Sequence, residues 1–233
     1  MVLMRLAVNE LFGPTFQGEG VSQGRVASFL RLHGCHLACA WCDTPQTWDH
    51  DRHPPAGERR LLDTTEVLDW VVEQPTELLV ITGGEPLLQQ RALGELLTAI
   101  TDRRAVSEIE VETSGTITPS LVVAQTVNRF TVSTKLANAK MPLHRRVRPA
   151  ALRALAMTGK ASWKFVVQSP DDLDEAAELV QTYRLGPVWV MPEGTEEAVL
   201  LQRMRELADP VLARGWNLTS RLHILLWGDV RGR

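Results

Sequence analysis

The chain has 233 residues, of which 44% are hydrophobic and 23% charged, and a formal net charge of −3. This length can bury one sizeable core, so we expect a single domain over residues 1–233. The balanced charge without a pronounced basic stretch argues against a nucleic-acid-binding protein, and the absence of a long apolar run argues against a membrane protein.

Strand-like apolar runs alternate with helical patterns from about residue 25 onward. We expect strands at residues 25–32, 78–82, 108–112, 129–133, 163–167 and 188–191. Helical patterns include 64–74, 87–102, 171–183 and 196–214, whereas the polar, Pro-rich residues 50–57 predict an irregular connection. This alternation predicts an α/β fold with a parallel sheet. Six such units are too few for a closed eightfold barrel, so we expect a partial, open TIM-like barrel with outer helices.

Residues suited to ligand binding follow each predicted strand. The cysteine-rich loop stands after the first strand, and the later strands are followed by residues 83–86, 112–115, 133–135, 168–170 and 191–192. The carboxyl ends of parallel barrel strands meet at one edge, which is the catalytic face of such barrels. We therefore expect six separate segments to build one active site.

All three cysteines of the chain, Cys35, Cys39 and Cys42, fall within eight residues at the spacing Cys-x3-Cys-x2-Cys. Clustered thiolates are typical of iron-sulfur or zinc sites. Three cysteines without a fourth would leave one iron of a 4Fe-4S cluster open, whereas a zinc site would take His33 or His36 as its fourth ligand. The short, charged N-terminal run does not resemble a signal peptide, so we expect a reducing cytoplasm and metal rather than disulfides.

Three further features suit a small-molecule site, and each also has a purely structural interpretation. The backbone of Gly83-Gly84-Glu85-Pro86 can approach a charged amine or carboxylate, or can simply form a strand-to-helix turn. The TFQGEG segment at 15–20 can read the edge of a heterocycle or form a polar turn. Arg31 can bind a substrate carboxylate from the barrel interior or form an ion pair facing solvent.

The cysteine spacing, with Trp41 before the third cysteine, resembles the radical S-adenosylmethionine superfamily, and the GGEP turn strengthens this resemblance. The motifs TFQGEG, FLRLHGC, CAWCDT, ITGGEP, VETSGT and RLHILLWG occur in this order and resemble the 7-carboxy-7-deazaguanine synthase family. The resemblance implies a radical S-adenosylmethionine core that uses a 4Fe-4S cluster, S-adenosylmethionine and Mg²⁺. It also implies a lyase of queuosine (7-deazapurine) biosynthesis, in which a 5'-deoxyadenosyl radical starts the ring contraction of 6-carboxy-5,6,7,8-tetrahydropterin with loss of ammonia.

The resemblance also implies roles for individual residues. The cluster ligands would be Cys35, Cys39 and Cys42, and Thr44 would bind Mg²⁺. The pterin contacts would be Phe16, Gln17, Gly18, Glu19, Arg31, Thr82 and His223. The S-adenosylmethionine contacts would be Trp41, Cys42, Asp43, Gly83, Gly84, Glu85, Glu112, Ser133, Thr134, Lys135, Gln168, Ser169, Pro170 and Asp171. For His223 a structural histidine beside the apolar run 224–227 is an equal alternative.

Two other functions stay open at this point. A glycyl-radical activating enzyme would use the same cysteine spacing and GGEP turn on a partner protein, but it would not need the QGEG loop or Arg31. A non-catalytic zinc-binding module would explain the cysteines alone. For the synthase, the resemblance implies a flavodoxin- or ferredoxin-type electron donor and a homodimer.

Overall fold

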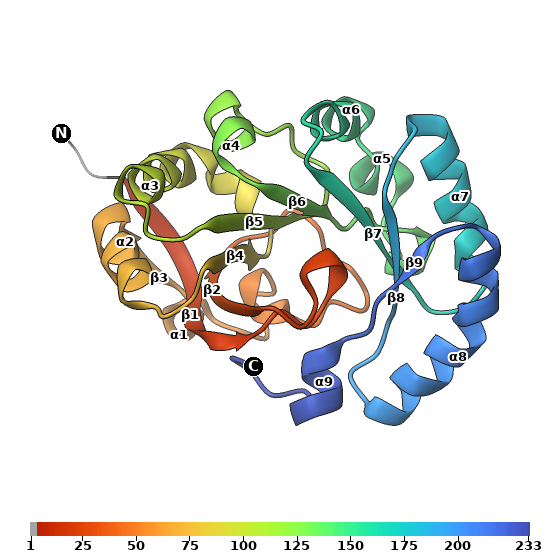
Figure 1. Ribbon diagram of the computed structural model, residues 1–233. Helices are drawn as coiled ribbons and strands as arrows, with labels where there is room; N and C mark the ends of the chain where they lie inside the picture. The colour runs from red at the N-terminus through yellow and green to blue at the C-terminus, as the bar shows by residue number, and fades with distance from the viewer. Residues whose placement is uncertain (1–3) are drawn as a thin grey trace.

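The computed structural model describes residues 4–233, and all strands among them belong to one sheet in the order β3-β1-β2-β4-β5-β6-β7-β8-β9 (Figure 1). The strands are β1 (Arg5–Phe16), β2 (Val26–Leu32), β3 (Arg60–Asp63), β4 (Leu78–Gly83), β5 (Glu108–Thr113), β6 (Arg129–Val132), β7 (Ala161–Val167), β8 (Val188–Pro192) and β9 (Asn217–Leu218). From β2 through β9 every neighbouring pair is parallel. The six predicted strands are thereby confirmed.

The helices lie outside the curved sheet, and the sheet ends at β3 and β9 without closing, which confirms the open, partial barrel (Figure 1). The longer helices are α2 (Thr64–Glu73), α3 (Gln90–Arg103), α6 (Pro149–Met157), α7 (Asp172–Tyr183) and α8 (Glu197–Ala213). The shorter ones are α1 (Pro55–Glu58), α4 (Leu121–Thr126), α5 (Leu143–Arg146) and α9 (Leu222–Trp227). Short 3-10 turns occur at Gly20–Ser22, Pro45–Thr47, Pro86–Gln89 and Ala137–Ala139.

The N-terminal part of the sheet differs from the prediction. Residues 5–16 form the longest strand, β1, which pairs antiparallel with β2 and also with β3. The sheet is therefore mixed, because β1 and the edge strand β3 add two antiparallel pairings to the parallel strands. The prediction missed β1 because Asn9, Glu10 and Pro14 interrupt its apolar pattern, and Thr15 and Phe16 of the expected loop are the last residues of the strand. Within the connection at 50–57, the helix α1 begins at Pro55.

Burial of apolar side chains on both faces explains why the central strands read as continuous apolar runs. All seven residues of β7 are buried, and Phe130, Trp163 and Phe165 are among the largest side chains completely removed from solvent. One core cluster fills the space between the sheet and the helices. The charged residue on β7 is Lys164, whose side chain is on the opposite face from Trp163 and points into the barrel. Interior polar groups of this kind define the site.

Among residues 4–233, no helix is both long and apolar enough to cross a bilayer.

Candidate active site

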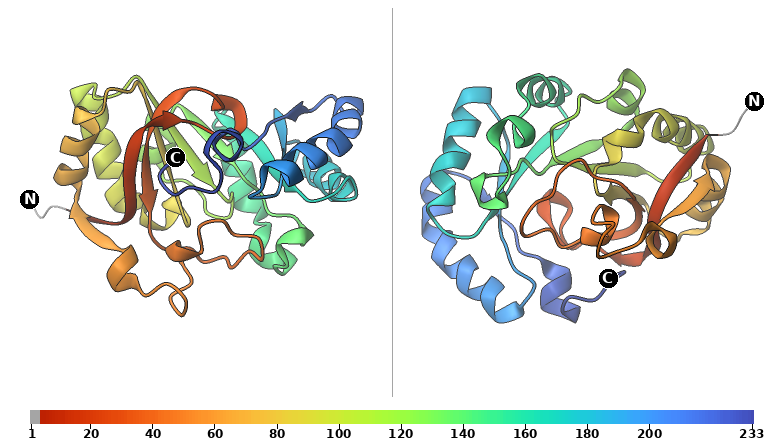
Figure 2. Two further views of the ribbon diagram at one scale, coloured as in Figure 1. Left: turned by 90° about the horizontal axis from the view of Figure 1, so that it is seen from below. Right: turned by 180° about the vertical axis from the view of Figure 1, so that it is seen from behind.

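A cavity of about 440 Å³ opens at the carboxyl edge of the parallel strands. Its walls come from the residues before β2, the strand ends, the cysteine loop after β2 and the C-terminal segment after α9. Seen from behind, the segment between β2 and β3 lies over the centre of the ring of strands (Figure 2). This volume is in the range of sites for small ligands. The strand ends thus meet at one cavity, and of the six segments predicted to build the site only residues 168–170 do not line it.

The cavity is lined by eighteen of the residues predicted from sequence. They are Phe16, Gln17, Gly18, Glu19, Arg31, Cys35, Cys39, Trp41, Cys42, Asp43, Thr44, Thr82, Gly83, Gly84, Glu112, Ser133, Lys135 and His223. The residues that do not line it are Glu85, Thr134, Gln168, Ser169, Pro170 and Asp171.

The three cysteines are free thiols on one wall of this cavity. The Leu37 backbone N–H lies 3.4 Å from Cys35 Sγ, and the Trp48 indole N–H lies 3.2 Å from Cys42 Sγ. Burial raises the pKa of Cys35 to about 12 and also raises the pKa of Cys39. Thiols buried in this way ionise when a metal takes the place of the proton, and nearby N–H donors stabilise the resulting sulfur charge. The donor set therefore fits a thiolate-bound metal centre.

The two histidines considered as a fourth zinc ligand each pair with another side chain through Nε2, while the Nδ1 atom of each is buried without a hydrogen-bond partner in the described chain. His33 Nε2 lies 3.1 Å from His50 Nε2, and His36 Nε2 lies 2.8 Å from the Thr116 hydroxyl. In the described part of the chain, no three His, Cys, Asp or Glu side chains surround one point closely enough to hold a single ion. The three cysteines share one cavity wall.

The two glycines of the GGEP turn lie directly against the backbone that enters the cysteine loop. A Cβ on Gly83 would lie 2.1 Å from the Leu32 carbonyl oxygen, and one on Gly84 would lie 2.2 Å from the Gly34 carbonyl oxygen. The Glu85 N–H donates to that same Gly34 oxygen at 2.9 Å. Only glycine permits this approach, which joins the turn to the cysteine loop and leaves the turn's backbone facing the cavity.

Glu85, one of the predicted S-adenosylmethionine contacts, is 0% exposed and does not line the cavity. Its carboxylate accepts hydrogen bonds from the Thr113 hydroxyl at 2.7 Å and from the Ser114 N–H at 2.8 Å. Glu85 therefore ties the turn after β4 to the end of β5. Thr134 is also buried, at 1% exposure, so it too supports the fold beside the cavity instead of lining it.

A second predicted contact region, residues 168–171, lies behind the cavity wall. Asp172 accepts the Gln168 N–H at 2.7 Å and the Asn138 side-chain amide at 2.9 Å. Asn138 in turn accepts the Trp41 indole N–H at 3.0 Å. The turn therefore reaches the cavity only indirectly, because it supports Trp41. Lys135 lies on the cavity side of Trp41, with its ammonium 5.1 Å from the indole ring centroid.

The interior of the barrel carries a polar cluster centred on Glu112. Its carboxylate accepts the Gln17 side-chain amide at 3.0 Å and the Thr82 hydroxyl at 2.7 Å. Gln17 is held from its other end, because its amide oxygen accepts the Glu19 N–H at 3.3 Å. Carboxylate, amide and hydroxyl thus form a fixed row of donors and acceptors on the cavity wall, which suits the edge of a polar heterocycle.

Glu19 is the centre of a buried ion network that the sequence did not reveal. Lys164 donates to one carboxylate oxygen at 2.5 Å, and Arg221 donates to the other at 2.9 Å. Arg221 also pairs with Asp43 of the cysteine motif and donates to the Gly194 carbonyl at 2.8 Å. Burial raises the pKa of Glu19, but the two cations outweigh burial and hold this pKa well below its usual range.

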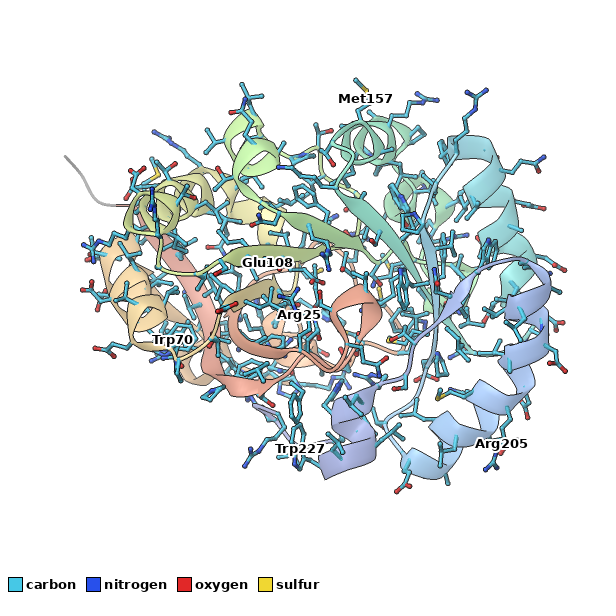
Figure 3. The ribbon with its side chains drawn as sticks, viewed as in Figure 1. Arg25, Trp70, Glu108, Met157, Arg205 and Trp227 are labelled. Carbon is cyan, nitrogen blue, oxygen red and sulfur yellow. The ribbon has the colours of Figure 1, made fainter. Side chains whose placement is uncertain are left out.

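Gly18 and His223 are in direct contact. A Cβ on Gly18 would lie 1.9 Å from His223 Nδ1, and the Leu222 N–H donates to the Gly18 carbonyl at 2.8 Å. Burial lowers the pKa of His223, although Glu19 opposes this shift, so the imidazole is neutral near pH 7. Beside it, Phe16 stacks on Trp227 of α9 with ring centroids 6.1 Å apart. Figure 3 labels Trp227. The structure thus brings His223 to the cavity.

Arg31 and the chain end form the outer rim. Arg31 lines the cavity and donates through Nε to Glu10 at 2.8 Å. Glu10 also pairs with Arg231, whose guanidinium reaches Glu58 of α1 at 2.6 Å. Residues 229–233 all line the cavity. Sequence reasoning missed Glu10 and Arg231 because they lie outside any recognisable motif.

Thr44 lines the cavity beside the cysteines. Its hydroxyl lies 3.8 Å from Cys42 Sγ, which is a weak contact that leaves the oxygen available. A hydroxyl oxygen is a hard donor of the kind that Mg²⁺ prefers.

Comparisons with known proteins agree with this arrangement. A protein-family model described as a 4Fe-4S single cluster domain matches residues 16–154, which include all three cysteines. A 7-carboxy-7-deazaguanine synthase of Pyrobaculum aerophilum is 36% identical over 232 residues, covering 98% of each chain. Another, of Halobacterium salinarum, is 32% identical and covers 96% of this chain and 91% of the relative. The crystal structure of QueE from Escherichia coli matches with a TM-score of 0.71 at 25% identity, covering 94% of this chain and 95% of that one.

Proposed function

This chain belongs to the 7-carboxy-7-deazaguanine synthase family, and on this premise we propose that it converts 6-carboxy-5,6,7,8-tetrahydropterin to 7-carboxy-7-deazaguanine with loss of ammonia. The reaction is a radical S-adenosylmethionine-dependent ring contraction in queuosine and 7-deazapurine biosynthesis. One observation carries the proposal: a single cavity is lined both by the three cysteines and by the polar row of Gln17, Thr82 and Glu112.

Cys35, Cys39 and Cys42 would hold the 4Fe-4S cluster, because three thiolates leave one iron without a protein ligand. When bound, the cluster and S-adenosylmethionine supply a 5'-deoxyadenosyl radical. The backbone of Gly83 and Gly84 faces the cavity next to the cysteine loop and would receive the charged amine of the cofactor. The other residues proposed to contact S-adenosylmethionine are Trp41, Asp43, Glu112, Ser133 and Lys135. Residues 168–171 would act through Asp172 and Trp41.

The pterin would lie between the polar row and the rim. Gln17 and Glu112 present amide and carboxylate groups for the nitrogen-rich edge of the ring, and the Gly18 backbone lines the cavity beside them. Arg31 would bind the pterin carboxylate, since its Nε is held by Glu10 while the terminal guanidinium nitrogens form no hydrogen bond within the described chain. His223 would face the same ring as a neutral imidazole. Glu19 would support this wall through its ion network.

Thr44 would bind Mg²⁺ through its hydroxyl, leaving water and substrate oxygens to complete the octahedron. The motivating observation is the free hydroxyl on the cavity wall beside Cys42.

The rim and the size of the cavity favour a synthase over an activating enzyme that acts on a partner protein. Residues 229–233 lie across its rim, and Arg231 links β1 to α1 there. A glycyl-radical activating enzyme must admit a protein backbone to the cluster, which this arrangement obstructs. The 440 Å³ volume instead suits a small molecule.

We further propose that the chain acts as one domain in the cytoplasm, forms a homodimer and receives electrons from a flavodoxin- or ferredoxin-type protein. These proposals follow from the family and from three free thiols that need a reducing compartment.

The decisive test is anaerobic reconstitution with iron and sulfide, followed by turnover of the carboxypterin with S-adenosylmethionine, with Mg²⁺ present and omitted. We expect 7-carboxy-7-deazaguanine as product and a faster rate with Mg²⁺. A cluster-loaded protein that cleaves S-adenosylmethionine in the presence of the pterin but leaves the pterin unchanged would refute the substrate assignment.

A further inference from the structure

Charge is distributed very unevenly along this chain. Residues 113–170 contain nine lysines and arginines and no aspartate or glutamate, whereas the other 175 residues contain 16 basic and 28 acidic residues. The overall net charge of −3 therefore conceals one strongly positive region. Four consecutive elements, from β6 to α6, lie within it.

Several cations of this region are neutralised within the protein, but three around α5 are not. Lys164 pairs with Glu19, and Arg146 pairs with Glu175 at 2.6 Å. By contrast, three exposed side chains have no carboxylate within 4.0 Å in the described part of the chain. We call these three residues, Lys140, Arg145 and Arg148, the basic patch.

The basic patch lies directly against the outer side of the cysteine loop. The Ala40 N–H donates to the Ala139 carbonyl at 3.0 Å, and Arg145 donates to the His36 carbonyl at 2.5 Å. In the view from behind, α5 lies beside the segment that follows β2 (Figure 2). The unpaired positive charge is therefore concentrated where the cysteines are nearest to this surface.

Only small side chains flank the middle cysteine of the cysteine loop at this surface. This cysteine, Cys39, is only 8% exposed but stands between Ala38 and Ala40, which are both exposed. Alanine is the smallest side chain after glycine, so another molecule could come close to the Cys39 sulfur. Leu143 adds an apolar side chain that is 59% exposed beside the charges.

We propose that the basic patch is the docking surface for an acidic electron-carrier protein of the flavodoxin class. This inference rests on the proposed function, because the cluster must first be reduced by one electron from outside before it can cleave S-adenosylmethionine. The carrier's flavin hydroquinone gives up that electron and becomes the semiquinone, while the cluster is reduced by one electron. Electron tunnelling falls off steeply with distance, so the donor must approach the cysteine loop closely.

The surface matches such a partner in charge and in apolar character. Carboxylates around an exposed flavin complement Lys140, Arg145 and Arg148, and the apolar edge of the flavin complements Leu143. Charge complementarity mainly accelerates encounter and weakens with salt, as expected for a transient electron-transfer complex.

The test compares two double variants that each remove two positive charges. K140Q/R148Q changes the patch but keeps Arg145, which contacts the cysteine loop. R103Q/R205Q changes exposed arginines elsewhere, at the end of α3 and on the outer side of α8 (Figure 3). Binding of oxidised flavodoxin to each reconstituted enzyme is measured by calorimetry at low and physiological salt. We expect the patch variant to bind about five- to tenfold more weakly and the control variant to bind like wild type.

Turnover driven by dithionite provides the second readout, because this small reductant needs no docking surface. We expect both variants to turn over like wild type with dithionite, while the patch variant alone needs more flavodoxin for half-maximal rate. Equal flavodoxin affinities in the two variants would overturn the proposal. Binding of another molecule to the patch, such as nucleic acid, would not rescue it. Loss of iron or of dithionite-driven turnover in the patch variant would also overturn it. Docking without pterin turnover would refute the proposed substrate alone.

Discussion

Arg221 and Glu19 are 202 residues apart in sequence and form a buried ion pair at 2.9 Å. Their side chains are only 7% and 14% exposed, and Arg221 extends further to Asp43 beside the third cysteine. One guanidinium thus joins the segment before α9, the loop before β2 and the cysteine loop. The position of the proposed pterin-binding wall relative to the cluster loop depends on this network.

Replacing Glu19 with glutamine should therefore destabilise the protein and weaken substrate binding. The change leaves Lys164 and Arg221 as buried cations without their shared carboxylate, which costs about 3–5 kcal/mol. The contribution of Glu19 is present above its ordinary pKa of 4.5 and is lost as pH falls, because its folded-state pKa is lowered. Thermal unfolding at pH 7 measures the effect, with exposed Glu178→Gln as the matched control. Equal melting temperatures for the two variants would contradict the network's role.

Substitution of Gly84 by alanine should prevent cluster assembly. The new Cβ would lie 2.2 Å from the Gly34 carbonyl oxygen and 2.8 Å from Cys35 Cβ, so the cysteine loop must move. We expect the iron content after reconstitution to fall well below that of wild type. Gly57→Ala is the matched control, because a Cβ there meets no atom within 4 Å. Normal iron content in the Gly84 variant would show that the turn and the loop do not depend on each other.

How far the sequence predicts this site depends on the kind of signal each residue gives. Cys35 and Gly84 belong to short motifs whose spacing reflects local geometry, so their place on the cavity wall followed once the strand ends were predicted. Glu85 belongs to the same motif, but the sequence could not reveal that its carboxylate turns toward Thr113 and Ser114. Arg221 and Glu10 act through partners that are distant in sequence, and a single sequence carries no pattern for such pairs.

The strands likewise divide into those that a local pattern predicts and those that depend on partners distant in sequence. The six parallel strands are apolar over most of their length because both faces are covered, and this pattern is local. β1 was missed because it is an antiparallel addition to the sheet, and its interrupted pattern makes sense only when β2 and β3 lie on either side. Lys164 lies within an apolar run, and its burial is explained only by its ion pair with Glu19, which is distant in sequence.

His223 should make stability depend on pH between neutral and mildly acidic conditions. Burial lowers its pKa below the ordinary 6.5, and Arg221 adds to this, while Glu19, Asp43 and Glu112 oppose it. Below pH 6.5 the unfolded chain binds a proton that the folded chain resists, so the His223 contribution to stability is lost as pH falls toward the folded-state pKa. Melting temperatures of wild type and His223→Asn at pH 7.5 and 5.5 test this. We expect a smaller loss on acidification in the variant, and parallel losses would contradict the assignment.

Arg231 should control how tightly the cavity rim closes over the substrate. Its guanidinium pairs with Glu58 through both terminal nitrogens, at 2.6 and 3.2 Å, and also with Glu10, which holds Arg31. Arg231→Gln removes this link between β1 and α1 and leaves Arg31 as the remaining ion-pair partner of Glu10. Glu10 then competes more strongly with the substrate carboxylate for the Arg31 guanidinium. The pairs are partly exposed, so we expect a small stability loss of about 1 kcal/mol or less.

The kinetic expectation for Arg231→Gln is a rise in KM for the carboxypterin of about five- to tenfold with little change in kcat, because binding is weakened without altering the reacting groups. Arg52→Gln is the matched control, since Arg52 is exposed, pairs only with Asp49 at 2.5 Å and does not line the cavity. Steady-state kinetics with dithionite as reductant separate KM from kcat without involving an electron-carrier protein. A fall in kcat at unchanged KM would mean that Arg231 instead acts on the reacting geometry, and identical constants in the two variants would show that the rim link is only a surface ion pair.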